Sequence, residues 1–380
     1  MSNNIKSKIA TYALALAPIL SIYSFVAGLS IGYALLILAL ILNFNKSYCK
    51  NSIEYKFYIA VIILSVLGFL FNISNIWFNA VTWVNNILSL SVILLSLVML
   101  IPSVNHNIFK RIVLFVGIAA SIIVSYQYVF YKVSGIANFN MYIPGLELII
   151  DKEEAINIYN YRPSAFFLEP SHLSIYLAPL VVLMLHEKKY VLCTIFTIGI
   201  LASGSSSGML FLMIGYAYWL FSSKQKTSTI VFVVIFGFSI MYYLQNLMTS
   251  NIDRLTNYDT NSIRLLGSLV YFNSFDTINW LFGVGLNQLS EMQRSLGNIQ
   301  DYNVNYAAAI IYMTLSYGIS GLIVLVSYLF HLIKLHRASM GVILIFIGVI
   351  FSDQILFNYN YLYLVSFILL FPRLINCDQK

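Results

Sequence analysis

The chain has 380 residues, a length that in a soluble protein would suggest two or three domains. Its composition excludes that class, because 60% of the residues are hydrophobic and 9% are charged, whereas soluble domains carry roughly 25% charged residues. The net charge is +7, but no basic cluster interleaves with aromatic residues, so we expect no nucleic-acid partner. The composition predicts an all-α polytopic membrane protein, with residues 1–380 forming a single integral membrane domain.

Apolar runs separated by charged and turn residues predict about 12 transmembrane helices, or about 11 if two of them join. We expect these spans near residues 9–26, 29–44, 57–71, 81–101, 112–131, 169–185, 190–203, 208–221, 228–247, 306–332, 339–352 and 356–371. The runs 190–203 and 208–221 are short for a bilayer, and they can form two helices or one long kinked helix. A cluster of small residues, 203–208, lies between them.

The distribution of cations predicts which loops face the cytoplasm. With a cytoplasmic N-terminus, 15 of the 21 Lys and Arg residues lie on that side: Lys6, Lys8, Lys46, Lys50, Lys56, Lys110, Arg111, Lys188, Lys189, Lys224, Lys226, Lys334, Arg337, Arg373 and Lys380. This separation requires an even number of crossings between Lys189 and Lys224, which favours two short helices over one kinked helix. Both termini are therefore expected in the cytoplasm.

Two outer segments, 132–168 and 248–305, are too long to be simple turns. Long loops in an otherwise economical chain are usually functional or disordered. These two contain aromatic residues, glycines and apolar stretches rather than low-complexity sequence. We expect both to fold onto the outer surface of the membrane.

The first outer loop ends in a dense group of ionisable residues, Arg162, Glu169 and His172, where a span begins. Glu169 and His172 are three residues apart and can share a helix face, and Pro170 marks a helix start with Glu169 near the N-cap. The structural alternative is a capping carboxylate with a snorkelling arginine. Ionisable groups at membrane depth cost free energy and are therefore rare except at functional sites. This favours a functional role for the three residues.

The second outer loop contributes Arg254 and Arg264, whose guanidinium groups can bind phosphate oxygens or, alternatively, lipid headgroups. Other residues that can bind sugar hydroxyls or stack on sugar rings are Tyr161, Phe166, Phe167, Asn303, Asn305 and Tyr306. No His, Cys or acidic residues have the spacing of a zinc site, and the chain has no nucleotide-binding motif. We therefore expect no metal and no cofactor.

In their order along the chain, these segments resemble the O-antigen polymerases (Wzy), a family within the superfamily of O-antigen polymerases and ligases. The resemblance covers about residues 110–335 and rests on the following segments: Arg162-Pro163-Ser164, Phe167-Leu168-Glu169-Pro170-Ser171-His172, the turn 203–208, Arg264, Leu281-Phe282-Gly283-Val284-Gly285, and Asn305 with Tyr317-Gly318-Ile319-Ser320-Gly321. Ligases commonly place an arginine in the small-residue turn, where this chain has Ser206, and a His-Asn pair before the late glycines, where it has Asn303 and Asn305 without a histidine. Both differences favour a polymerase.

The resemblance implies a membrane glycosyltransferase with a GT-C-type fold in the bacterial inner membrane, with both long loops in the periplasm. Its donor and acceptor would be undecaprenyl-pyrophosphate-linked oligosaccharides, and the growing chain would move from its lipid carrier onto a new lipid-linked repeat unit. The partners implied are these lipid-linked glycans, membrane lipid and a chain-length regulator protein. The catalytic arginines of the family would correspond to Arg162 and Arg264.

A chemical role follows for each ionisable residue in this interpretation. The arginines would stabilise the charge of the departing pyrophosphate, and His172 or Glu169 would accept the proton of the attacking sugar hydroxyl. Two alternatives stay open: an O-antigen ligase with a lipid A–core acceptor, and a transporter or flippase for a lipid-linked oligosaccharide. Transporters usually carry functional charges within broken spans, whereas the charges here lie at span ends and in loops.

Overall fold

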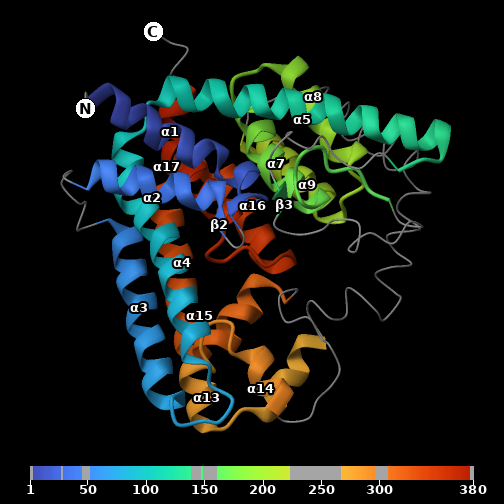
Figure 1. Cartoon of the computed structure of the whole chain (residues 1–380). Helices are drawn as coiled ribbons and strands as arrows, with labels where there is room; N and C mark the ends of the chain where they lie inside the picture. The colour runs from blue at the N-terminus through green and yellow to red at the C-terminus, as the bar shows by residue number, and fades with distance from the viewer. Residues whose placement is uncertain are drawn as a thin grey trace.

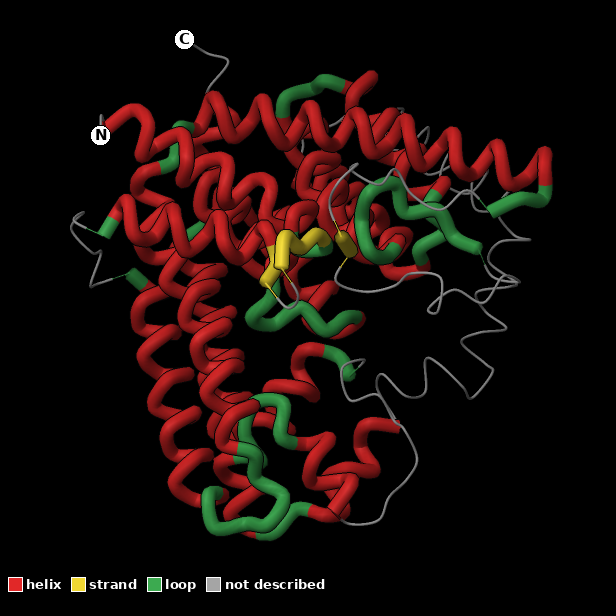
Figure 2. Tube along the Cα trace, viewed as in Figure 1, coloured by secondary structure: helices red, strands yellow, loops and turns green. Residues whose placement is uncertain are grey.

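The computed structural model describes residues 3–26, 29–44, 52–137, 147–148, 161–222, 267–295 and 307–376. Helices dominate these residues, as Figure 1 and Figure 2 show. The α-helices of the first half are α1 (Asn3–Leu20), α2 (Ile31–Asn43), α3 (Ile53–Asn72), α4 (Ala80–Leu100) and α5 (His106–Ser134). Those of the second half are α7 (Pro170–His186), α8 (Tyr190–Ala202), α9 (Ser206–Ser222), α13 (Thr277–Phe282), α14 (Leu289–Ser295), α15 (Ala309–Leu335), α16 (Met340–Ser352) and α17 (Tyr359–Ile375).

Short 3-10 helices and strands complete the described structure. The 3-10 helices are η1 (Ile101–Ser103), η3 (Gly267–Ser274) and η5 (Arg337–Ser339). The strands are β1 (Tyr23–Val26), β2 (Leu29–Ser30) and β3 (Glu147–Leu148), and they form one antiparallel sheet in the order β2-β1-β3. This small sheet is a departure from the purely helical expectation.

The prediction of a helical membrane protein agrees with the lengths and composition of the helices. Four described helical segments are long and apolar enough to cross a bilayer: Ile53–Asn72, Ala80–Ser103, His106–Ser134 and Ala309–Leu335. Six shorter apolar helices accompany them, within 31–43, 170–186, 190–202, 206–222, 337–352 and 359–375. The predicted span 228–247 lies outside the described residues. The count of twelve spans therefore stays a prediction.

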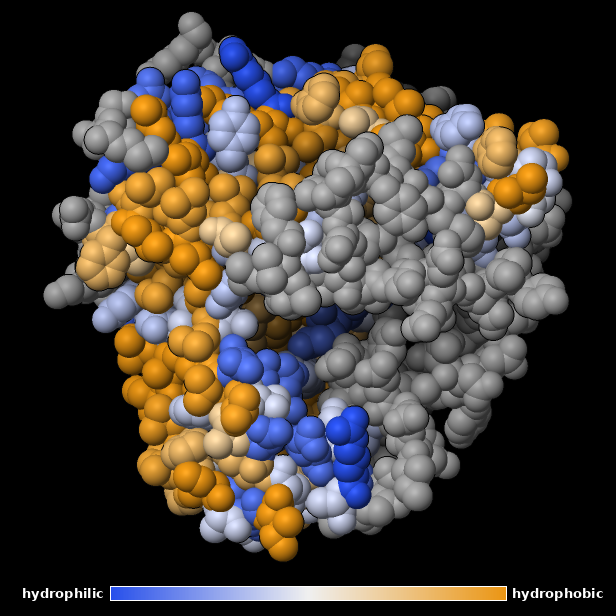
Figure 3. All heavy atoms as spheres, viewed as in Figure 1, coloured by the Kyte–Doolittle hydropathy of each residue, from blue (hydrophilic) through white to orange (hydrophobic). Residues whose placement is uncertain are grey.

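Stripes of exposed apolar side chains show which helix faces suit lipid. On α3 and α5, large hydrophobic residues recur at intervals of three, four or seven residues, which places them on one side of each helix. These exposed residues are Ile59, Ile63, Val66, Leu70, Phe115, Ile122, Val129 and Val133. Continuous apolar faces of this kind are rare on proteins surrounded by water. Figure 3 shows hydrophobic residues covering much of the visible face over α2 and α3.

One predicted span is wrong in its second half. We expected a helix over 9–26, but α1 ends at Leu20 and Tyr23–Val26 form β1. Aromatic and β-branched residues favour strands, and β1 finds partners on both sides, in β2 and in β3 of the first long loop. The sheet thus attaches the first long loop to the connection between α1 and α2.

The choice of two short helices near residue 203 is confirmed. The chain leaves α8 at Ala202 and begins α9 at Ser206. Toward the end of α8 that is distant from the turn, Cys193 Sγ lies 3.4 Å from the Tyr216 hydroxyl, and the rings of Tyr190 and Trp219 lie 6.4 Å apart. These contacts pair residues at nearly equal distances along the chain on either side of Gly204, so α8 and α9 run antiparallel.

Buried charges join three helix ends. Lys110 Nζ at the start of α5 lies 2.6 Å from Glu187 Oε1 at the end of α7, and it donates to the Leu374 carbonyl of α17 at 3.2 Å. Lys189 Nζ lies 2.9 Å from the other oxygen of Glu187. The side chains of Lys110 and Glu187 are each 6% exposed, a depth at which a charge needs a partner.

The two chain ends lie at this same end of the molecule. Ser7 of α1 donates to the Ser103 carbonyl at 2.7 Å, just before the start of α5, and Arg373 donates to His106 Nε2 at 3.3 Å. Figure 1 shows both termini at this end. The structure therefore places the start of α1 and the end of α17 at the same end of the molecule. Their assignment to the cytoplasm stays a prediction.

The long helices do not all share one direction. In Figure 1, α3 and α4 run side by side, whereas α5 lies across the end of the molecule that holds the termini. The segment before α17 also reaches the start of α3, where the rings of Phe57 and Phe357 lie 6.3 Å apart. Both residues stand at the start of a predicted span, but the predicted topology puts these two starts on opposite sides of the membrane. This arrangement therefore does not align every predicted span with one membrane axis.

Two glycine segments pack backbone against backbone where α13 meets α15. Gly283 has φ +73° and Gly318 has φ +66°, values that only glycine adopts readily. A Cβ atom added at Gly283 would lie 2.3 Å from the backbone of Ser316 and Tyr317, and one at Gly318 would lie 2.4 Å from the backbone of Leu281. We call this contact, between residues 281–285 and 315–318, the glycine clasp.

The glycine clasp also pairs the polar groups of a broken helix. Gly318 has non-helical backbone angles inside α15, so the carbonyl groups before it lose their helical partners. The N–H groups of Val284 and Gly285 donate to the carbonyls of Leu315 and Ser316 at 3.1 and 2.9 Å. Because hydrocarbon supplies no hydrogen bonds, such replacement is what makes a break in an apolar helix tolerable.

We predict that Gly283→Ala and Gly318→Ala each lower the thermal midpoint of the detergent-solubilised protein and its abundance in membranes. The expected cost is roughly 2–6 kcal/mol, from backbone strain plus overlap with backbone atoms that cannot move aside. Gly135→Ala is the control, because Gly135 also has a positive φ but an added Cβ meets nothing within 4 Å. It should cost roughly 1–2 kcal/mol. Equal losses of thermal midpoint at all three positions would show that the glycine clasp does not contribute to stability.

Candidate functional site

The helix that carries the first group of ionisable residues begins where the sequence predicts. Pro170 opens α7, with Glu169 as its N-cap in an extended conformation, φ −135° and ψ 155°. Proline suits this position because its ring fixes a helical φ and its missing N–H would have no partner there. Glu169 and His172 consequently stand at the N-cap and at the third helical residue.

The Glu169 carboxylate does not cap the helix. Its side chain makes no hydrogen bond to the N–H groups of the first turn, so the capping role considered for it is not what the structure shows. Instead it accepts a hydrogen bond from the Ser171 hydroxyl at 3.1 Å. Ser171 is buried and Glu169 is half-buried. The carboxylate is thereby held at the helix start with capacity to accept further hydrogen bonds.

The direct pairing of Glu169 with His172 that we considered is not formed. Within the described residues, no hydrogen bond or ion pair joins Glu169 to either His172 or Arg162. The physical reason is that Glu169 lies before the first helical turn, where the extended backbone does not give the three-residue spacing of a helix face. His172 is half-buried and lies three residues after Glu169, so a ligand can still contact both side chains.

A polar residue of α5 anchors the preceding loop. The buried Gln127 accepts a hydrogen bond from the Ala165 N–H at 2.9 Å, and Ala165 has φ +52°. A turn follows in which Ser164 Oγ donates to the Phe167 carbonyl at 2.9 Å and the Phe167 N–H donates to the Ser164 carbonyl at 2.9 Å. These bonds fix the path by which the chain approaches α7.

Two aromatic residues expected to stack on sugars instead pack the loop onto the helices. Tyr161 is buried, with its ring centroid 4.8 Å from that of Tyr131 on α5, and desolvation raises the pKa of Tyr161 to about 12. Phe167 is fully buried against Tyr176. Neither ring presents a face to a ligand in this arrangement. Of the three aromatic residues 161, 166 and 167, Phe166 is half-buried and so keeps part of its ring accessible to a sugar.

The small-residue turn lies against the same helix start. A Cβ atom added at Gly208 would lie 2.3 Å from Ser174 Oγ in the first turns of α7. One added at Gly204 would lie 3.8 Å from Cγ and Cδ of Arg162, so the aliphatic part of that arginine covers the turn. Arg162 itself is exposed. The structure therefore brings Arg162 and the first turns of α7, which begin beside Glu169 and His172, against the turn 203–208, two segments that are separate in the sequence.

Several predicted site residues cannot be placed. Arg254, Arg264, Asn303, Asn305 and Tyr306 lie outside the described residues. Among the residues described, no three His, Cys, Asp or Glu side chains gather in a way that would hold a metal ion.

Sequence reasoning missed Ser171 and Gln127. Ser171 was read as part of a helix start only, yet its hydroxyl holds the Glu169 carboxylate. Gln127 is an isolated polar residue in an apolar run, and such residues in membrane helices usually have a specific partner. That signal was sufficient to single it out.

The sequence matches no protein-family model, and no curated protein matches it significantly. The resemblance to O-antigen polymerases therefore rests on the segments quoted above.

We predict that His172→Ala and Glu169→Gln each lower the polymer-forming activity that the resemblance implies, by about a hundredfold if the residue acts as the base. Gln keeps the shape of Glu and loses its charge. The measurement is polymer length and amount in a strain that lacks the native gene. His331→Ala is the control, since His331 is an exposed histidine near the far end of α15. Normal polymer from both variants, at normal membrane abundance, would show that neither residue is the base.

Proposed function

We propose that the protein is a membrane glycosyltransferase that polymerises undecaprenyl-pyrophosphate-linked repeat units of an O-antigen or related surface polysaccharide. The reaction would take place on the periplasmic face of the inner membrane. The observation that carries the proposal is that Arg162 and α7 both lie against the turn 203–208, while the start of α7 supplies a carboxylate in Glu169 and an imidazole in His172.

A second contact supports the same proposal. The glycine clasp joins the two later segments on which the resemblance rests, one in the second long loop and one in α15. Among the described residues, the segments on which the resemblance rests thus form two sets of neighbours in space. A chance similarity of short segments gives no reason to expect such pairing.

The chemistry uses groups that the chain supplies. A hydroxyl of the acceptor sugar attacks the anomeric carbon of the donor, the new glycosidic bond forms, and the bond to the pyrophosphate oxygen breaks. Arg162 and Arg264 would stabilise the negative charge on the departing undecaprenyl pyrophosphate. His172 or Glu169 would take the hydroxyl proton. Phe166, whose ring stacks on Phe167 at 5.2 Å and stays half-buried, would contact a sugar with its remaining surface.

A transporter is the alternative from another class, and the break in α15 bears on it. Broken helices in transporters often leave backbone carbonyls free to bind ions. Here the carbonyls of Leu315 and Ser316 already accept hydrogen bonds from Val284 and Gly285. The break therefore serves the attachment of the second long loop, which favours an enzyme that acts at the membrane surface.

We predict that Arg264→Ala nearly abolishes polymer and that Arg264→Lys restores little of it. Lysine keeps the charge but lacks the planar guanidinium that binds two phosphate oxygens at once. A hydrogen bond to a charged group contributes roughly 1.5–3 kcal/mol, or about ten- to a hundredfold in rate. The measurement is the ladder of lipopolysaccharide chain lengths from a polymerase-null strain that carries each variant.

Arg337→Ala is the matched control, because Arg337 is an exposed arginine in η5, on the side predicted to be cytoplasmic. A single-repeat band with Arg264→Lys, at normal membrane abundance, supports the pyrophosphate contact. A full ladder with Arg264→Lys contradicts it and leaves a headgroup anchor. The same strain separates polymerase from ligase, because a polymerase null still attaches one repeat to the core whereas a ligase null attaches none.

A further inference from the structure

A groove of about 550 Å³ opens at the end of the molecule opposite the termini, between the α3–α4 connection and α14. Its wall on one side is formed by residues 76–81, which include Trp77 and Phe78, and on the other by Glu291, Arg294 and Ser295. Small-molecule sites usually have volumes of roughly 300–1,000 Å³. The groove therefore has the size of a ligand site, and it is separate from the site at the start of α7.

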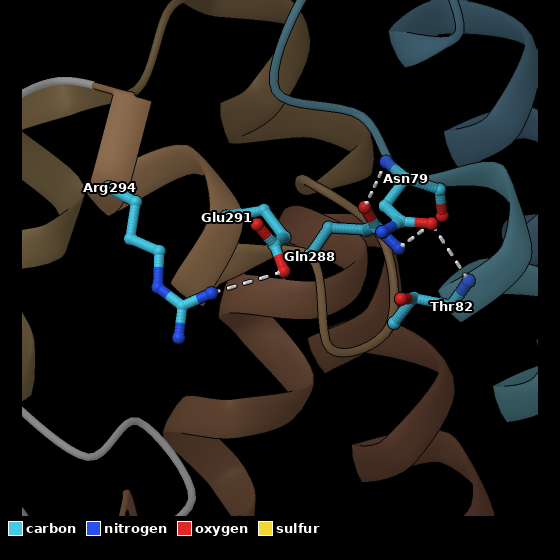
Figure 4. Close-up of polar contacts among 5 residues, drawn as sticks. All are labelled: Asn79, Thr82, Gln288, Glu291 and Arg294. Atoms are coloured by element: carbon cyan, nitrogen blue, oxygen red, sulfur yellow. Dashed lines mark hydrogen bonds and ion pairs between the residues drawn. The ribbon is translucent and has the colours of Figure 1, made fainter.

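The two walls of the groove are fixed to each other. The side chain of Gln288, which is fully buried, accepts from the Asn79 N–H at 2.9 Å and donates to the Asn79 carbonyl at 3.1 Å, as Figure 4 shows. The Asn79 side chain in turn caps α4 by accepting from the N–H groups of Val81 and Thr82. A pre-formed wall of this kind lowers the cost of ordering the site when a ligand binds.

The polar side of the groove has both signs of charge, held loosely. Arg294 and Glu291 form an ion pair at 3.6 Å, with their side chains 77% and 35% exposed (Figure 4). An exposed pair at this distance contributes little to stability, so both groups can turn to a ligand. A carboxylate accepts hydrogen bonds and a guanidinium donates them, and together they favour neither anions nor cations. Such a pair suits a ligand rich in hydroxyl groups.

The aromatic side of the groove suits the apolar faces of sugar rings. Pyranose rings have apolar C–H faces, which pack on aromatic rings while the hydroxyls at their edges bind polar groups. Trp77 is half-buried, because part of it packs on the small apolar cluster around Val284 and Leu289. Its indole is thereby held in a fixed orientation beside the groove. An aromatic wall facing donors and acceptors is the arrangement that recognises a carbohydrate.

We propose that this groove is a second, non-catalytic binding site for a glycan, one that holds a part of the oligosaccharide away from the reacting sugar. The inference rests on the proposed function for its choice of ligand only. Residues 73–80 and 283–295 both belong to segments that the sequence places on the outer side, where a lipid-linked glycan would be presented. The groove binds the neutral sugars of the glycan and does not bind its pyrophosphate.

The test is calorimetric titration of the purified full-length protein in detergent with the lipid-free oligosaccharide released from the cell's own surface polysaccharide. Glu291→Gln and Arg294→Gln should each weaken binding by about tenfold or more. Both residues are surface-exposed, so the variants should fold. Arg337→Gln, which removes an exposed arginine elsewhere, should bind like the unmodified protein.

Two further results separate this inference from the proposed function. His172→Ala should bind the oligosaccharide normally, because the groove is distinct from the start of α7. If the unmodified protein binds the oligosaccharide but forms no polymer from lipid-linked repeat units, the polymerase proposal fails and the groove stands. No binding of the oligosaccharide, or unchanged binding by both groove variants, overturns the inference, as does tighter binding of glycerophosphocholine than of the oligosaccharide.

Discussion

A polar group that leaves water for hydrocarbon must bring a partner with it, and this constraint shapes each part of the structure. It explains why Lys110 and Glu187 meet where three helices end and why the break at Gly318 coincides with two N–H donors from another segment. It also explains why Gln127, alone in an apolar helix, holds the loop that leads to α7. The buried polar contacts of this protein are therefore also its points of attachment between distant segments.

These attachments build the candidate site and the groove from segments far apart in the chain. The end of the loop after α5 is fixed by Gln127, and Arg162 in it lies on the turn between α8 and α9. The glycine clasp holds α13 on α15, and Gln288 holds the next segment on the α3–α4 connection. Helices with apolar outer faces thus also hold loop segments from both halves of the chain through polar contacts.

The sequence predicted the features that depend on local chemistry. Pro170 opens a helix and small residues separate α8 from α9, because both features follow from the backbone preferences of a few residues. The prediction failed where contacts between distant segments decide the structure. Tyr23–Val26 form a strand because β2 and β3 supply hydrogen-bonding partners. Burial of Tyr161 likewise depends on Tyr131, a residue of another segment.

The central claim is that the chain forms glycosidic bonds between lipid-linked glycans. It is tested most directly by reconstituting the purified protein in lipid vesicles with undecaprenyl-pyrophosphate-linked repeat units and separating the products by length. The account predicts lipid-linked chains of two or more repeats, with one undecaprenyl pyrophosphate released for each bond formed. Repeat units that cross the bilayer without being lengthened, or that stay unchanged where they were added, would contradict it.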